Sequence, residues 1–429
     1  MDNANVGTSR DDRATPASPA PSRSMALRIW ARIGFLSFGG PTAQIALMHR
    51  VLVDETKWLT ERQFLHALSF CMLLPGPEAM QLATYAGWRL HGTRGGIAAG
   101  LLFVLPGAIV VLAMAMIYAA FGRLAIVEAL FLGIKAAVLV IVIEALLRIS
   151  KRALKPGEPW IIAGLSFTAI FFFALPFPLI IAIAALYGMF RATALAPHYP
   201  GERATIPVRL RDTVRTVTIW LFVWIAPLVA IAAFLGRDHI LSQLAWFFSK
   251  LAVVTFGGAY AVLAYMGQDV VVRHGWLEAG QMMDGLGLAE TTPGPLILVT
   301  EFVGYLAAYR HGGGMDWIAG LCGAVVALWA TFAPCFLWIF AGAPYIEWLN
   351  EQPKLKGALA AITAAVVGVI LNLAIWFGLH VLFPADSGPD WFGICVCVAA
   401  FIALLRWKVD ILWIVAAGCT LGIAWHALA

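Results

Sequence analysis

Charged residues are scarce in this sequence, and their scarcity excludes a water-soluble fold. Only 12% of the 429 residues are Asp, Glu, Lys or Arg, whereas soluble domains usually contain about 25%. The hydrophobic fraction is 61% and the mean hydropathy is +0.85, which is more apolar surface than a soluble core can bury. The apolar runs are unbroken rather than alternating, so we predict an all-α polytopic membrane protein and not a β-barrel.

The sequence also lacks the common motifs of catalysis and cofactor binding. It has no C-x-x-C, H-E-x-x-H or G-x-x-x-x-G-K-[ST] pattern, which argues against redox, zinc-hydrolase and ATPase functions. The six cysteines lie in or beside apolar segments, so we expect no disulfide scaffold. We therefore predict no enzyme activity, no cofactor and no metal site. The basic residues gather in particular loops, which indicates membrane topology rather than nucleic-acid binding.

A polar N-terminus precedes thirteen apolar segments. Residues 1–24 are rich in Ala, Ser, Pro, Asp and Arg, and we interpret them as a disordered cytoplasmic tail. We expect no cleaved signal peptide, because the first segment carries Arg28 and Arg32 and continues into two glycines. Segments 160–175 and 177–190 flank two prolines, and we interpret them as two short spans. The thirteen segments are 27–48, 64–88, 95–120, 124–147, 160–175, 177–190, 217–236, 243–266, 282–308, 316–342, 357–382, 391–405 and 409–427.

Short motifs recur in the chain at a single offset of 218 residues. Equivalent segments are seven apart, and seven is odd, so the two halves must face opposite ways across the membrane. This pattern predicts an inverted repeat. The matches are Phe38-Gly39-Gly40 with Phe256-Gly257-Gly258, Trp58-Leu59 with Trp276-Leu277, Pro75-Gly76-Pro77 with Pro293-Gly294-Pro295, and Arg32 with Lys250.

The repeat and the basic residues together predict the domains and their orientation. We expect an N-terminal repeat at 25–190, a basic cytoplasmic linker with a connecting span at 191–242, and a C-terminal repeat at 243–429. With alternating spans, twenty basic residues lie on the side of the N-terminus and six lie on the other side. The excess predicts a cytoplasmic N-terminus and a periplasmic C-terminus in a bacterial inner membrane.

The repeated motifs are the candidate substrate site. Glycine and proline inside apolar segments break helices, and freed backbone groups at membrane depth are tolerated only against protein or a wet cavity. Half-helices that begin at Pro77 and Pro295 would direct their N–H groups toward an anion. The alternative is that the motifs are packing kinks and that Arg32 and Lys250 only snorkel to the interface. The predicted substrate-binding residues are Arg32, Phe38, Gly39, Gly40, Pro75, Gly76, Pro77, Lys250, Phe256, Gly257, Gly258, Pro293, Gly294 and Pro295.

Three glutamates are candidates for proton coupling. Glu78 directly follows the first Pro-Gly-Pro, Glu290 precedes the second, and Glu144 lies in another apolar segment. A carboxylate beside an anion site could carry a coupled proton. It could equally be a structural counter-ion for Arg32 or Lys250. Four further charges, Glu128, Lys135, Asp284 and Glu301, also fall inside apolar segments.

The motifs resemble those of the chromate ion transporter (CHR) family in its long, two-domain form. The resemblance extends from about residue 25 to residue 429. It implies two homologous halves of opposite orientation and about thirteen spans. The sequence departs from equivalence of its halves at Leu296, which occupies the position of the acidic residue after the first Pro-Gly-Pro. The motifs concerned are Gly34-Phe35-Leu36-Ser37-Phe38-Gly39-Gly40-Pro41, Leu74-Pro75-Gly76-Pro77, Leu105-Pro106-Gly107, Phe256-Gly257-Gly258-Ala259-Tyr260 and Thr292-Pro293-Gly294-Pro295.

The resemblance implies efflux of chromate, with chromate resistance in bacteria and sulfate as a related oxyanion. An inside-negative potential drives a dianion outward by about 4.6 kcal/mol per 100 mV, so export needs no ATPase. The alternatives are a carrier of sulfate or another anion, an anion channel, and a membrane enzyme that reduces chromate or modifies lipid. The expected partners are chromate, sulfate and the lipid bilayer, with no nucleic acid. A homodimer is also an expectation, although the sequence identifies no dimer face.

Overall fold

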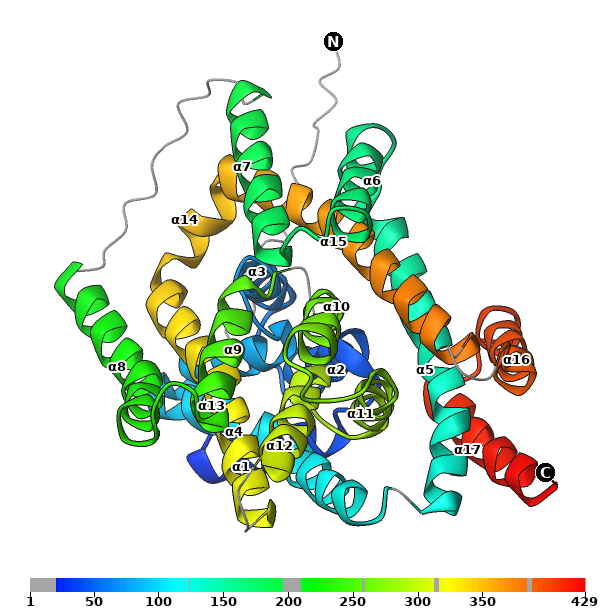
Figure 1. Cartoon of the computed structure of the whole chain (residues 1–429). Helices are drawn as coiled ribbons and strands as arrows, with labels where there is room; N and C mark the ends of the chain where they lie inside the picture. Colours follow the sequence, from blue (N-terminus) through cyan, green and yellow to red (C-terminus); the bar gives the residue numbers. More distant parts are fainter. Residues whose placement is uncertain are drawn as a thin grey trace.

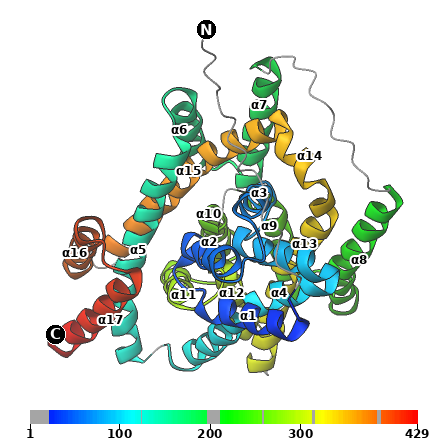
Figure 2. The same ribbon diagram turned by 180° about the vertical axis from the view of Figure 1, so that it is seen from behind.

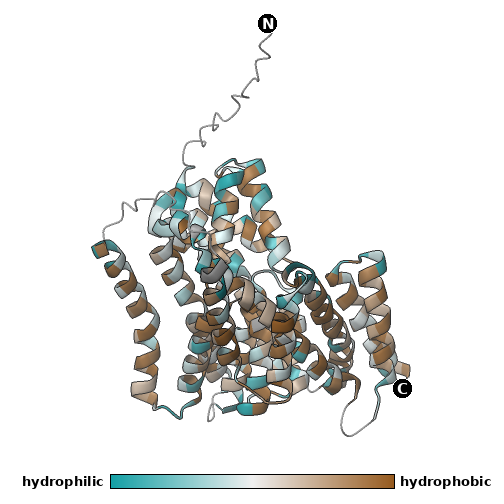
Figure 3. Cartoon of the chain, turned by 90° about the horizontal axis from the view of Figure 1, so that it is seen from above, coloured by the Kyte–Doolittle hydropathy of each residue, from teal (hydrophilic) through white to brown (hydrophobic). Residues whose placement is uncertain are grey.

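The computed structural model describes residues 21–122, 124–195, 210–256, 259–311, 316–383 and 388–428. Within these ranges the chain is helical and contains no β-strand, as the sequence predicts. Hydrophobic residues run along most of the helices, and hydrophilic residues gather mainly toward helix ends (Figure 3). The described helices that are long and apolar enough to cross a membrane number six: Glu78–Phe121, Ala125–Ala153, Leu210–Leu235, Asp316–Asn350, Pro353–Leu382 and Ile411–Leu428.

The first two apolar segments are broken at the predicted motifs. The first break contains Gly39, whose φ of +81° is a conformation that favours glycine. The second break ends at Pro77, which is the N-cap of the following helix. Helix breaks at Phe38-Gly39-Gly40 and at Pro75-Gly76-Pro77 are therefore confirmed. The helices are α1 (Arg23–Leu36), α2 (Gly40–His49), α3 (Glu61–Cys71) and α4 (Glu78–Phe121).

The corresponding segments of the second half are broken in the same places. One helix ends at Val254, just before Phe256, and the next begins at Ala259, while Gly257 and Gly258 lie outside the described residues. Gly294, in the second Pro-Gly-Pro, has φ of +94° and separates two further helices. These elements are α9 (Ile240–Val254), α10 (Ala259–Gln268), α11 (Ala279–Thr291), the 3₁₀ turn η3 (Leu296–Leu298) and α12 (Val299–His311).

In the first half the broken segments are hairpins, which differs from the expected spans over 27–48 and 64–88. Arg32 of α1 pairs with Glu55, beyond the end of α2, over 3.1 Å, and the rings of Trp30 and Trp58 lie 6.3 Å apart. The chain that follows α2 therefore lies beside α1 again, so α1 and α2 form a hairpin.

Helix α4 contains the turn that closes the second hairpin. His91 and Gly92 have non-helical backbone angles, and Gly92 has φ of +64°. On either side of this turn the backbones of Gly87 and Gly95 touch, so α4 consists of a short arm, 78–90, folded against a long helix, 93–121. His91 borders the same small pocket as Trp30, so this turn and the entrance of α1 lie at one end of the molecule.

The second half contains equivalent hairpins. The ring of Phe247 in α9 lies 5.4 Å from the rings of both His274 and Trp276, which follow α10. Arg310, at the end of α12, donates to the backbone carbonyl of Trp276, just before α11. The entrance of α11 and the exit of α12 therefore lie together, and both broken segments return to the side from which they came.

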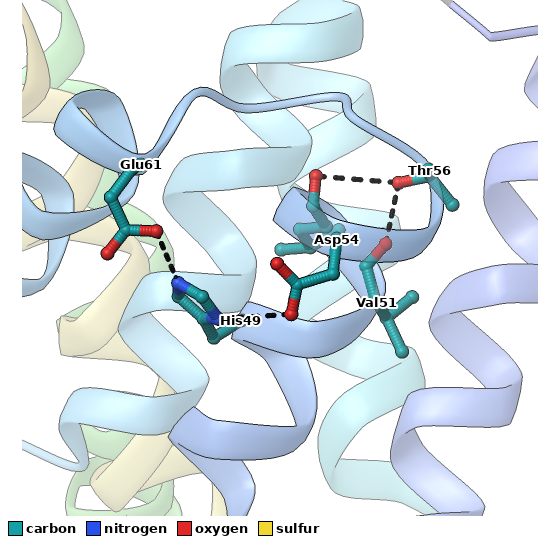
Figure 4. A network of polar contacts seen from close by, with 6 residues as sticks. His49, Val51, Asp54, Thr56 and Glu61 are labelled. Atoms are coloured by element: carbon teal, nitrogen blue, oxygen red, sulfur yellow. Dashed lines mark hydrogen bonds and ion pairs between the residues drawn. The ribbon is translucent and has the colours of Figure 1, made fainter.

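The 218-residue offset is visible in local structure as well as in sequence. The π-helical turns η1 (Arg50–Glu55) and η2 (Asp269–Arg273) follow α2 and α10. Capping boxes then start the next helices, at Thr60 with Gln63 and at Glu278 with Gln281. In the first half, His49 also contacts the carboxylates of Asp54 and Glu61 across this turn (Figure 4).

The remaining helices surround the hairpins. In Figures 1 and 2, α2, α3 and α9 to α12 lie centrally, with α6, α7, α8, α16 and α17 at the periphery. Glycines allow close helix contact, as where Gly133 of α5 meets Gly418 of α17 and Gly188 of α7 meets Gly357 of α15. The surrounding elements are α5 (Ala125–Ala153), α6 (Glu158–Phe171), α7 (Phe177–Leu195), α8 (Leu210–Leu235), α13 (Asp316–Gly342), η4 (Ala343–Tyr345), α14 (Ile346–Glu351), α15 (Pro353–Leu382), α16 (Trp391–Trp407) and α17 (Ile411–Leu428).

Candidate functional site

Each hairpin has its tip at a Phe-Gly-Gly or Pro-Gly-Pro break. The tips of the two halves meet through a reciprocal pair of backbone hydrogen bonds. The amide of Gly76 donates to the carbonyl of Thr255 over 2.9 Å, and the amide of Gly294 donates to the carbonyl of Ser37 over 2.7 Å. Both the two donors and the two acceptors are 218 residues apart. Exchanging the halves reproduces the contact, which is the signature of a local two-fold relationship.

The tips are packed so closely that only glycine fits at several positions. A Cβ atom on Gly76 would lie 2.9 Å from Sγ of Cys335, and φ at this residue is +121°. Gly107 of the Leu105-Pro106-Gly107 motif touches the carbonyl of Pro293, so the third motif supports the second Pro-Gly-Pro. The side chain of Gln44 donates to the carbonyl of Gly294 over 2.6 Å and ties the first tip to the second.

A pocket of about 170 Å³ lies beside the first Pro-Gly-Pro tip. It is bounded by the starts of α2, α4 and α10 and by the facing sides of α5 and α15. Two guanidinium groups enter it from one face of α5, at Arg148 and Arg152. The other polar or motif residues in its lining include Pro41, Thr42, Leu74, Gly76, Glu78, Ala259, Tyr260 and Thr363.

The pocket is basic and offers hydrogen-bond donors. Thr363 donates to the carbonyl of Leu359 and Tyr260 donates to Glu290, so these hydroxyls are engaged elsewhere. Arg148, which also pairs with Glu144, and Arg152, which also donates to Sδ of Met72, line the cavity together with Thr42. A planar guanidinium binds oxyanions in a bidentate manner, and the N-terminus of α4 favours negative charge in the same place.

The three predicted carboxylates surround this pocket. Glu78 lines it, and Glu144 pairs with Arg148 over 2.9 Å. Glu290 accepts a hydrogen bond of 2.8 Å from the hydroxyl of Tyr260. Glu290 is therefore held by a tyrosine and not by Arg32 or Lys250.

The two predicted cations lie elsewhere. Arg32 pairs with Glu55, and the exposed fractions of the two side chains are 51% and 37%. Lys250 is exposed and lies 5.8 Å from the centre of the Tyr265 ring. Neither is among the described residues that line the pocket. Phe38 is exposed at its tip, and Phe256 is half-buried.

Arg148 and Arg152 are not among the substrate-binding residues that the sequence predicts. Both follow the end of the predicted segment 124–147, which is the position of a loop on the side of the N-terminus. A signal was present, since Glu144, Arg148 and Arg152 are spaced by four and share one helix face. The approach of that helix end to a hairpin tip depends on tertiary packing, which the spacing does not contain.

Broken apolar helices around a basic pocket are typical of membrane transport proteins. A family model described as "Chromate transporter" matches residues 25–189 and 242–423. The chain therefore belongs to the chromate transporter family, whose members are transport proteins and not enzymes. The resemblance drawn from the motifs is confirmed.

Individual relatives match most of the chain. It is 32% identical over 368 residues to the chromate transport protein of Pseudomonas aeruginosa, which covers 84% of this chain and 82% of the relative. It is 30% identical over 349 residues to the chromate transport protein of Cupriavidus metallidurans, covering 80% of each. It is 30% identical over 364 residues to a probable chromate transport protein of Synechococcus elongatus, covering 84% of this chain and 86% of the relative. No solved structure matches the chain.

Proposed function

We propose that the protein exports chromate across the bacterial inner membrane and thereby confers chromate resistance. The observation that carries this proposal is the pocket at the hairpin tips, where Arg148 and Arg152 face the N-terminus of α4. The relatives named as chromate transport proteins supply the substrate class. Sulfate has the same charge and tetrahedral shape, so a sulfate carrier is the alternative that the same pocket allows.

The topology we propose has four re-entrant hairpins and nine crossing helices. The hairpins of the first half enter from the cytoplasm and those of the second half from the periplasm, so that their tips meet near the middle of the membrane. The reciprocal bonds between Gly76 and Thr255 and between Gly294 and Ser37 support this inverted arrangement. The crossing helices are 93–121, α5, α6, α7, α8, α13, α15, α16 and α17. The repeats are proposed at 25–190 and 243–429.

The distribution of basic residues supports the same topology. Hairpins place Arg50, Lys57 and Arg62 on the cytoplasmic side and Arg273 on the periplasmic side. The cytoplasmic side then has twenty-two basic residues and the periplasmic side four, compared with twenty and six for thirteen full spans. A cytoplasmic N-terminus and a periplasmic C-terminus follow.

In this orientation the pocket opens toward the cytoplasm, where chromate is captured. The membrane potential favours the outward passage of a dianion by about 4.6 kcal/mol per 100 mV. Glu144 competes with the anion for Arg148, and Glu78 opposes it electrostatically. Protonation of either group, or of Glu290 behind Tyr260, would strengthen anion binding, so all three are proposed as modulators of the pocket.

A binding measurement tests the site. Purified protein in detergent is titrated with chromate by calorimetry at alkaline pH, with sulfate as competitor. The proposal expects binding that is lost in Arg148→Gln and Arg152→Gln and retained in Arg191→Gln, because Arg191 pairs with Glu158 away from the pocket. Binding of sulfate with no binding of chromate would favour the alternative function. Wild-type affinity in both pocket variants would refute the site.

A further inference from the structure

A second cavity lies toward the opposite end of α5, and it is lined by an ion pair between a partly exposed lysine and a buried aspartate. Its volume is about 1100 Å³, and its walls come from the end of α4, the start of α5, and α11, α12 and α17. At its inner wall, Oδ1 of Asp284 lies 3.7 Å from Nζ of Lys135. Lys135 and Arg148 are thirteen residues apart on α5, which is about 20 Å along the helix, so the two cavities approach the hairpin tips from opposite directions.

The carboxylate of Asp284 is buried and held in place by a hydrogen bond. Asp284 is 3% exposed, and Oδ2 accepts a hydrogen bond of 2.7 Å from the hydroxyl of Tyr118. The Tyr118 ring is fixed edge-on by Phe131 and Phe302. Oδ1 accepts no hydrogen bond, because the lysine ammonium is beyond hydrogen-bond length. Oδ1 therefore faces Lys135 without a hydrogen bond, and a proton can add to it.

The ion pair of Lys135 and Asp284 is surrounded by a glycine and by further charged or titratable side chains. A Cβ on Gly280 would lie 3.1 Å from Nζ of Lys135, so glycine leaves room there for the ammonium. Neither α15 nor η3 contributes a described residue to the cavity wall. The other titratable or charged side chains that line the cavity are Glu128, Glu278, Tyr309, Arg310 and His426.

Helix α11 connects this pair to the anion pocket. Asp284 and Glu290 are six residues apart on it, about 9 Å, and Glu290 binds the Tyr260 hydroxyl that lines the anion pocket. The same helix leads into the tip at Gly294, whose amide binds Ser37. A change of charge at Asp284 therefore acts on α11, whose far end contacts the anion pocket through Glu290 and leads into the tip at Gly294.

We propose that Asp284 is the proton-binding residue of the transport cycle. It takes its proton from this second cavity, the outer cavity, which lies on the periplasmic side in the proposed topology, and it pairs with Lys135 when it is deprotonated. This inference rests on the proposed transport function. A proton from the outer side adds to Oδ1 and converts the carboxylate to a neutral acid. Lys135 then loses its counter-ion, and α11 is released from α5. Proton entry and anion capture thus use opposite cavities joined by one helix. The first half has His66 at the equivalent position, so only the second half has this carboxylate.

The test separates anion exchange from proton-driven transport. Wild-type protein and the variant Asp284→Asn are reconstituted in liposomes, with the membrane potential clamped at zero by potassium and valinomycin. Chromate exchange is measured at equal alkaline pH on both sides, and net flux is measured with acid on the outer-cavity side. Glu128→Gln, in the same cavity, is the control.

We expect Asp284→Asn to retain exchange and to lose the flux driven by the pH gradient, whereas the control retains both. Gradient-driven flux in Asp284→Asn would overturn the proposal, and so would loss of exchange together with it. Wild-type flux that follows the potential but ignores the pH gradient would also overturn it and would leave the export function standing.

A spectroscopic measurement distinguishes failure of the proposed proton site from failure of the proposed transport function. Infrared difference spectra between acid and alkaline pH detect protonation of a buried carboxyl group in the purified protein without any substrate. The proposal expects a carboxylic acid band in wild type that is absent in Asp284→Asn and present in Glu128→Gln. If no oxyanion moves but this band is found, the substrate assignment has failed and the proton site stands. Absence of the band in wild type would refute the proton site.

Discussion

The amide of Gly294 donates a 2.7 Å hydrogen bond to the carbonyl oxygen of Ser37, a residue 257 positions earlier in the chain. Its counterpart is the bond from Gly76 to Thr255. These two contacts join the tips of the two halves through backbone atoms. Positions 76 and 294 therefore tolerate neither a side chain nor a change of φ.

Replacing Gly76 or Gly294 with Leu should abolish chromate transport. Each glycine has positive φ, which costs other residues about 1–3 kcal/mol, and a side chain at Gly76 would meet Cys335. Transport is measured in vesicles and insertion by membrane fractionation. The control is Gly275→Leu, which has φ of +60° but open space around it. Equal flux in all three variants would reduce the motifs to packing kinks.

Comparison of Arg148→Ala with Arg32→Ala decides which cations serve the anion. The sequence symmetry favours Arg32 and Lys250, whereas the pocket favours Arg148 and Arg152. Arg32 loses only an exposed ion pair, typically worth about 0–1 kcal/mol, so we expect Arg32→Ala to transport normally and Arg148→Ala to be inactive. Initial rates over a range of chromate concentrations measure the difference. The reverse result would place the site beside the pair of Arg32 and Glu55.

Tyr260→Phe should weaken chromate binding and destabilise the protein. The change removes the donor to Glu290 and leaves a buried carboxyl group without that bond, at a cost of about 1–3 kcal/mol. We expect an increased KM and a lower melting temperature in detergent. Tyr265→Phe is the control, because Tyr265 lines a different pocket, together with Asp269, and does not contact Glu290. An unchanged KM with a lower melting temperature would make Tyr260 purely structural.

Gly133→Leu should separate α5 from α17 and lower thermal stability. The backbone of Gly133 touches the carbonyl of Gly418, so a larger residue forces the helices apart. Thermal unfolding of the detergent-solubilised protein measures the effect. Gly164→Leu, on an open face of α6, should leave the melting temperature unchanged. Similar melting temperatures for both variants would contradict the proposed packing role.

The sequence could predict where helices break but not how the broken pieces fold. Glycine and proline cause the breaks at Gly39 and Pro77, so these were accessible from residue chemistry alone. A segment such as 27–48 has the length of a span, and only the contact of Arg32 with Glu55 identifies it as a hairpin. The proposed role of Arg148 could not be predicted for a similar reason, since it depends on how closely the end of α5 approaches a tip from another part of the chain.

The most direct test of the account is chromate flux in inside-out membrane vesicles. A lumen-positive potential is imposed without a pH gradient, and sulfate is added as a competitor. The account predicts that chromate accumulates in proportion to the potential, that sulfate inhibits this uptake, and that the double variant Arg148→Gln and Arg152→Gln abolishes it. Chromate uptake that is indifferent to the potential, or that persists unchanged in the double variant, would contradict the proposed exporter.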